Sequence, residues 1–164
     1  MKTINELTEK IGINHLNEMQ GAVVKAIQHT NDNIMVLSPT GSGKTLAYIL
    51  PLVCMVDSAS DDLQAIVIVP GRELALQSLN VLRSLGNDVR GYACYGGRPT
   101  MDEHRQLRQL KPHIIFATPG RMNDHIDKDN VDVDSVKWII IDEFDKCLEM
   151  GFHEEMSYLI NRLP

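Results

Sequence analysis

Short apolar runs recur along the chain, and stretches with helical periodicity separate them. We predict strands from these runs, at residues 33–37, 65–69, 89–95, 113–117 and 138–141. Four of the runs are almost continuous in apolar and β-branched residues, as strands buried on both faces require, and the run at 89–95 is weaker. We predict helices at about residues 18–30, 43–57, 71–85, 100–110 and 119–127, with a last one near 152–162. Alternating strands and helices form a mostly parallel sheet, so the expected class is α/β.

Chain length and one proline bear on the organisation of this fold. A chain of 164 residues is long enough for one domain and short for two, so residues 1–164 are expected to form one globular unit. Pro51 falls inside the second predicted helix, where its missing N–H group should kink or locally break that helix.

The charge balance restricts how the chain could hold nucleic acid. The formal net charge is −6, which counts against the basic surface that usually grips nucleic acid. Aromatic residues make up 5% of the chain, which argues against a platform on which bases stack. Backbone N–H groups and helix N-termini can still hold phosphates, so any such contact is expected to involve the nucleic-acid backbone.

The cysteines, the histidines and the N-terminal residues indicate which compartment and which kind of metal site to expect. The three cysteines, Cys54, Cys94 and Cys147, are far apart and odd in number, as expected for reduced thiols. The six histidines are scattered as well, so no structural metal is predicted. The N-terminal residues lack the apolar core of a signal peptide, and no apolar run reaches the length of a membrane span. We therefore expect a cytoplasmic protein with no membrane partner.

The segment SPTGSGKT, residues 38–45, follows the first predicted strand and opens a helix, which is the context of a phosphate-binding loop. Gly41 and Gly43 allow the tight turn that points backbone N–H groups at a polyphosphate. We expect Lys44 to reach the β and γ phosphates of ATP, and the Thr45 hydroxyl to bind Mg²⁺. The strict pattern has glycine where this chain has Ser38. The expected nucleotide-binding residues of the loop are Thr40, Gly41, Ser42, Gly43, Lys44 and Thr45.

Two carboxylates follow the strand predicted at 138–141, where a parallel sheet presents its ligand-binding edge. We expect Asp142 to hold the Mg²⁺ ion, most simply through water, and Glu143 to orient or deprotonate the attacking water. Taken alone, the pair also fits an ordinary acidic loop. Together with the phosphate loop it predicts a catalytic set of Glu143, Lys44 and Asp142.

Five motifs occur in a fixed order along the chain: SPTGSGKT at 38–45, PGRELA at 70–75, YGG at 95–97, TPGR at 118–121, and DEFD at 142–145 with EMGF at 149–152. This order resembles the N-terminal RecA-like domain of the DEAD-box ATP-dependent RNA helicases, from about Gln20 to the end of the chain. The resemblance implies a RecA-like P-loop three-layer sandwich that binds ATP and Mg²⁺ and couples ATP hydrolysis to the unwinding or remodelling of RNA duplexes.

The resemblance also implies roles for particular residues. Gln20 would read the adenine edge of ATP, although Leu16, Asn17 and Glu18 replace the Pro-Thr-Pro that usually precedes this glutamine. The RNA track, which contacts the sugar-phosphate backbone independently of sequence, would consist of Pro70, Gly71, Arg72, Glu73, Gly97, Thr118, Pro119, Gly120 and Arg121. PGRELA also fits a plain helix start, and TPGR also fits a Pro-Gly turn with a solvated arginine.

In the family, a Ser-Ala-Thr strand and a second RecA-like domain follow the acidic motif, and the second domain supplies arginine fingers. The sequence reaches Pro164 without those parts. We therefore expect the domain to be incomplete at its C-terminal end, with a gap beside the phosphate-loop strand. We also expect hydrolysis by these residues alone to be very slow.

Two other functions remain open from the sequence. One is a DNA-dependent motor of the same superfamily. A comparison of how strongly RNA and DNA stimulate ATP hydrolysis would distinguish it. The other is a non-catalytic nucleotide-binding scaffold, in which Glu143→Gln would leave turnover unchanged.

Overall fold

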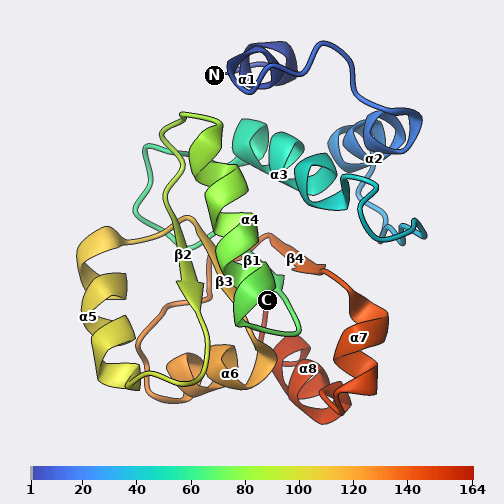
Figure 1. Ribbon diagram of the computed structural model, residues 1–164. Coiled ribbons are helices and arrows are strands. Elements are labelled where there is room, and N and C mark those ends of the chain that lie inside the picture. The colour runs from blue at the N-terminus through green and yellow to red at the C-terminus, as the bar shows by residue number, and fades with distance from the viewer. Residues whose placement is uncertain (1) are drawn as a thin grey trace. The chain divides into compact units, whose positions relative to one another are not determined.

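The computed structural model describes residues 2–164, and these divide into two compact units. Unit 1 comprises the chain up to Val56 together with Asn80–Asn87, and unit 2 comprises Asp57–Leu79 and Asp88–Pro164. Helix α4 (Arg72–Ser84) contributes residues to both units. Figure 1 shows the helices and strands of each unit.

Unit 2 is built on a parallel sheet with the strand order β2-β3-β1-β4. The strands are β1 (Ala65–Ile68), β2 (Gly91–Cys94), β3 (Ile114–Ala117) and β4 (Trp138–Ile141). The last residues of the four strands lie side by side, because Ala117 pairs with both Ile68 and Cys94, and Ile68 pairs with Ile141. The loops that follow the strands therefore leave the sheet at one common edge.

The central strands of unit 2 are buried on both faces, as their unbroken apolar sequences predict. Ile66 and Ile115 point to a core that also contains side chains from α5 (Thr100–Leu110), α6 (Pro119–Asp127), α7 (Phe144–Glu149) and α8 (His153–Ile160). Val67 and Phe116 lie on the opposite face and are 0% exposed. The α/β class with a parallel sheet is thus confirmed.

Unit 1 contains the helices α1 (Ile4–Lys10), α2 (Glu18–His29) and α3 (Lys44–Met55). Capping boxes start α1 and α2, the second formed by Asn17 and Gln20. The Lys2 and Lys10 ammonium groups donate hydrogen bonds to the Gly86 carbonyl at 2.7 and 2.5 Å, which ties α1 to residues 80–87.

Two predictions about unit 1 are wrong. Residues 33–37 form no strand in the part of the chain that the structure describes, and Met35 and Leu37 are 81% and 88% exposed. A strand needs a neighbour for its backbone N–H and C=O groups, and an apolar run does not supply one. Helix α3 also continues through Pro51 to Met55, so the expected local break is not found. Helices α1 and α7 were not predicted.

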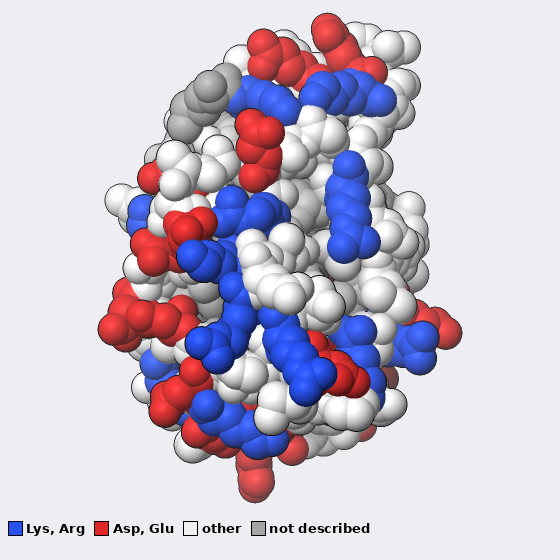
Figure 2. Space-filling view, turned by 90° about the vertical axis from the view of Figure 1, so that its left-hand side faces the viewer, with Lys and Arg blue, Asp and Glu red and all other residues white. Residues whose placement is uncertain are grey.

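The surface carries both signs of charge. On the face shown in Figure 2, Lys and Arg side chains are interspersed with Asp and Glu. This agrees with the net charge of −6, which leaves no excess of positive charge for a generic grip on nucleic acid.

Candidate functional site

The phosphate loop of unit 1 turns tightly at its two predicted glycines. Gly41 and Gly43 have φ angles of +80° and +89°, a region that residues with a Cβ atom rarely adopt. The Ser42 N–H donates to the Pro39 carbonyl at 3.3 Å, and Thr40 lies exposed within this turn. Helix α3 begins directly after Gly43 without a side-chain cap. Its first N–H groups are therefore free of a capping side chain and suit an anion.

Lys44 and Thr45 occupy the first turn of α3, as the loop motif predicts. The Lys44 ammonium donates to the Ser38 carbonyl at 2.5 Å, and the Ser38 hydroxyl donates to the Ser42 hydroxyl at 2.6 Å. The lysine charge is thus held over its own loop. Its partner there is a neutral carbonyl, which a phosphate oxygen can replace with a stronger, charge-assisted bond.

Asn17 and Gln20 attach the start of α2 to the phosphate loop. The Asn17 side-chain amide donates to the Ser42 carbonyl at 2.9 Å, and the Gln20 amide donates to the Gly43 carbonyl at 3.2 Å. Gln20 is 8% exposed, and its side-chain oxygen accepts the Asn17 N–H at 3.0 Å. The sequence reasoning missed this attachment, although the N-x-x-Q spacing of a capping box was visible. Adenine reading by Gln20 stays a prediction.

The acidic pair of unit 2 follows β4 at the common edge of the sheet. Asp142 is 7% exposed, and its N–H extends the ladder by donating to the Ile68 carbonyl at 2.9 Å. Glu143 caps α7 in a left-handed conformation with φ +52°, which is costly for a residue with a side chain. Its carboxylate lies 3.3 Å from the Lys146 ammonium.

The buried thiol of Cys147 lies near the acidic pair. Burial and the carboxylates of Asp142, Glu143 and Asp145 raise the pKa of Cys147 to about 11. Cys147 is 0% exposed, and its thiol points to the Asp142 carbonyl at 3.8 Å. It is a packing residue beneath the acidic pair rather than a nucleophile.

The three segments of the predicted RNA track leave the sheet at the same edge. Residues 70–73 follow β1, Gly97 follows β2, and residues 118–121 follow β3 and begin α6. Gly97 has φ +92° in a turn that glycine favours. The exposed members are Arg72, Glu73, Gly97 and Gly120, the partly buried members are Gly71, Thr118 and Arg121, and the buried members are Pro70 and Pro119.

A buried carboxylate that the sequence reasoning did not single out lies behind this edge. Glu103 of α5 is 0% exposed and accepts from the Tyr95 N–H, Arg98 Nε and Arg121 Nη1, each at 3.0 Å. It also lies 2.8 Å from His125 Nε2. Burial raises the pKa of Glu103, but the His125 and Tyr95 hydrogen bonds and the two arginine charges outweigh it, so the pKa lies below its usual value.

Three groups in this cluster have the spacing of metal ligands. One ligand atom each of Cys94, Glu103 and His125 lies within 4.8 Å of the others, a convergence that the sequence did not reveal. The guanidinium groups of Arg98 and Arg121 already neutralise the Glu103 carboxylate and would repel a cation. Burial also raises the pKa of the Cys94 thiol, which opposes the thiolate form that metals bind. The cluster is therefore an ion-pair centre.

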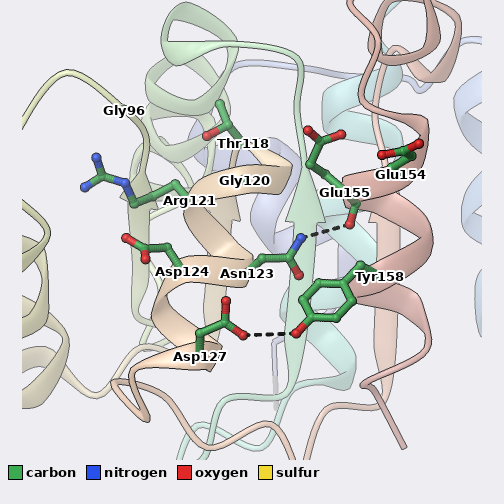
Figure 3. Close-up of a pocket in the computed structure, with 10 residues that line it drawn as sticks. All are labelled: Gly96, Thr118, Gly120, Arg121, Asn123, Asp124, Asp127, Glu154, Glu155 and Tyr158. Atoms are coloured by element: carbon green, nitrogen blue, oxygen red, sulfur yellow. Dashed lines mark hydrogen bonds between the residues drawn. The ribbon is translucent and has the colours of Figure 1, made fainter.

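An open pocket with a volume of about 770 Å³ lies between α6 and α8, beside the TPGR segment. Figure 3 shows the residues that line it. Thr118, Gly120 and Arg121 line one side, and the Asn123 amide donates to the Glu155 carbonyl at 2.9 Å across it. Asp124, Asp127, Glu154 and Glu155 also line the pocket. The carboxylates on its acidic side disfavour an anion such as phosphate.

Among residues 2–164, none of the helices combines the length and apolar character needed to cross a bilayer.

Comparisons with known proteins place these motifs in a family. Residues 17–164 match the family model described as DEAD/DEAH box helicase. The DEAD-box ATP-dependent RNA helicase CshA of Bacillus subtilis is 36% identical over 168 residues, covering 100% of this chain and 32% of that protein. The ATP-dependent RNA helicase CshA of Limosilactobacillus reuteri is 43% identical over 129 residues, covering 76% of this chain and 25% of that protein.

A solved structure shares the fold over the whole chain. The crystal structure of a DEAD box protein from the hyperthermophile Methanococcus jannaschii has a TM-score of 0.92 and 29% identity, covering 100% of this chain and 45% of that one. This likeness confirms the predicted RecA-like fold. The chain spans between a quarter and a third of the length of these two curated relatives. It belongs to the DEAD/DEAH box helicase family.

Proposed function

We propose that this chain is the ATP-binding motor domain of an ATP-dependent RNA helicase, a cytoplasmic enzyme that couples ATP hydrolysis to the unwinding or remodelling of RNA duplexes. The observation that carries the proposal is the register of the parallel sheet. Because the four strands end side by side, the acidic pair and the three predicted RNA segments leave the sheet of unit 2 at one edge. Ligands of open α/β sheets bind at that edge.

Mg-ATP is the nucleotide whose chemistry fits the predicted residues. Lys44 offers a cation for the β and γ phosphates, and the N–H groups at the start of α3 offer donors for phosphate oxygens. The Thr45 hydroxyl of unit 1 and the Asp142 carboxylate of unit 2 are oxygens of the kind that Mg²⁺ prefers, and they would hold the ion, which would neutralise phosphate charge. Glu143 then orients or deprotonates the attacking water. Gln20 completes the site at the adenine.

RNA is proposed to lie along the edge formed by residues 70–73, Gly97 and residues 118–121. These segments include the exposed residues Gly97 and Gly120 and the exposed Arg72, whose guanidinium can contact phosphate without reading bases. Binding is therefore expected to be independent of sequence. Both curated relatives are named as RNA helicases, which supports RNA as the ligand. In the longer protein, a second RecA-like domain is proposed to supply the remaining RNA contacts and the arginine fingers.

Two substitutions in the full-length protein test the nucleotide site. Lys44→Ala should abolish the rise in melting temperature that Mg-ATP produces, a stabilisation of about 2.7 kcal/mol at a ligand concentration of 100 times Kd. Glu143→Gln should keep that rise but abolish RNA-stimulated ATP hydrolysis. A Glu143→Gln protein with wild-type turnover would mean that the domain is a nucleotide-binding scaffold or that another residue activates water.

A further inference from the structure

We propose that Glu103 is the positioning residue of the RNA-binding edge, and that Arg121 acts through Glu103 rather than as a direct phosphate ligand. The inference rests on the proposed function, because it concerns the same RNA track. It divides the two arginines of that track by role. Arg72 contacts the RNA, whereas Arg121 holds the protein segments that do so.

The Arg121 guanidinium is committed to the protein. Nη1 donates to Glu103 Oε1 at 3.0 Å, and Nη2 donates to the Arg98 carbonyl at 3.0 Å. The Arg121 side chain is 13% exposed. Figure 3 shows its guanidinium directed away from the α8 residues of the pocket. An arginine held by a buried carboxylate and a carbonyl has little charge left for a phosphate.

Glu103 joins the two sides of the glycine turn to the TPGR segment. The Tyr95 N–H and Arg98 Nε both donate to its Oε2, and these residues flank Gly96 and Gly97 on either side. Arg121 in the first turn of α6 donates to Oε1. One carboxylate thus fixes two of the three RNA segments that follow neighbouring strands, β2 and β3.

Two further contacts hold this arrangement in place. The Arg98 Nη2 donates to the Ala93 carbonyl at 2.6 Å, and its guanidinium lies 4.1 Å from the centroid of the Tyr95 ring. His125 lies 2.8 Å from Glu103 Oε1 and is bonded on its other ring nitrogen to Asn130 at 2.9 Å. Removing the carboxylate leaves Arg98, Arg121 and His125 without the partner that they share.

Arg72 provides the contrast. It is exposed at the start of α4, and its guanidinium lies 5.3 Å from the Tyr95 ring centroid. It can therefore meet a phosphate with its charge unpaired. The slope of log K against log salt concentration is negative, and a residue that neutralises one phosphate of single-stranded nucleic acid increases its magnitude by about 0.7, whereas a positioning residue does not change it.

The test measures binding of a fluorescently labelled single-stranded RNA of fixed length by anisotropy, at several salt concentrations and with a non-hydrolysable ATP analogue. The full-length protein is compared with its Glu103→Gln, Arg121→Gln and Arg72→Gln variants. We expect Glu103→Gln and Arg121→Gln to weaken binding on the order of tenfold with an unchanged salt slope, because the backbone donors are misplaced. Arg72→Gln is expected to reduce the magnitude of the salt slope by about 0.7.

The double variant and a folding control complete the design. Glu103→Gln with Arg121→Gln together should weaken binding no more than Glu103→Gln alone, because Arg121 acts through a contact that Glu103→Gln already breaks. The rise in melting temperature with Mg-ATP shows that each variant is folded, and Arg98→Gln replaces Glu103→Gln if the latter fails this control. Wild-type affinity in Glu103→Gln, or in Arg98→Gln where it is substituted, would overturn the proposal. A salt slope of smaller magnitude in Arg121→Gln than in the wild type would also overturn it. If the wild-type protein itself does not bind RNA, the proposed function is wrong.

Discussion

The substitution Gly43→Ala tests whether the phosphate loop has the geometry described here. Gly43 has φ +89°, and a Cβ atom added to it would lie 2.3 Å from the Gln20 side-chain nitrogen. No heavy atoms approach that closely without bonding, so Gln20 must move. Its bonds to the Gly43 carbonyl and the Asn17 N–H, at 3.2 and 3.0 Å, are then lost or weakened.

The expected loss of unfolding free energy is about 2–5 kcal/mol. The left-handed conformation costs a residue with a Cβ atom about 1–2 kcal/mol. Each of the two hydrogen bonds contributes about 0.5–1.5 kcal/mol. With a urea dependence of about 2 kcal/mol per molar, in the middle of the typical range, the midpoint of urea unfolding should fall by roughly 1–2.5 M.

Urea unfolding of the chain, followed by circular dichroism, measures this loss, and Gly21→Ala is the matched control. Gly21 lies in α2, and a Cβ atom there meets nothing within 4 Å. That substitution should stabilise by about 0.5–1 kcal/mol, because alanine favours a helix interior. The reasoning is refuted if Gly43→Ala unfolds at the wild-type midpoint, or if Gly21→Ala loses as much stability as Gly43→Ala.

Two further predictions follow from pKa shifts. The folded-state pKa of Glu103 is depressed, so its contribution to stability is present above the ordinary glutamate pKa and is lost as pH falls through the folded value. At acid pH, the melting temperature of Glu103→Gln should therefore change less with pH than that of the wild type. An unchanged pH profile would contradict this. The Cys147 thiol is buried, and its pKa is raised to about 11. It should therefore react with a thiol reagent at neutral pH only after unfolding. Titration of free thiols with and without urea measures this difference.

The strands and helices of unit 2 were predictable because their local sequences carry the signal. The apolar run at 138–141 coincides with β4, and the helices predicted at 100–110 and 119–127 coincide with α5 and α6. Buried parallel strands read as unbroken apolar runs, and Pro119 is a favourable first residue for a helix. The run at 33–37 carries the same signal but is not a strand, because pairing depends on a neighbour that local composition does not reveal.

The individual site residues were predictable from motifs, whereas their attachments were not. Gly41 and Gly43 take the positive φ angles that the loop motif requires, and Asp142 follows its strand as expected. The Glu103 cluster arises only when α5, α6 and the loop after β2 converge in the folded chain. Its one local signal is that Glu103 lies four residues before the buried Leu107, on the apolar stripe of α5.

RNA-stimulated ATP hydrolysis by the full-length protein tests the central claim most directly. Steady-state turnover is measured with Mg-ATP alone, with single-stranded RNA, and with DNA of the same sequence, at one salt concentration. The proposed function predicts low turnover without nucleic acid, strong stimulation by RNA of any sequence, and little by DNA. Stimulation by DNA that equals or exceeds stimulation by RNA would contradict the assignment to an RNA helicase.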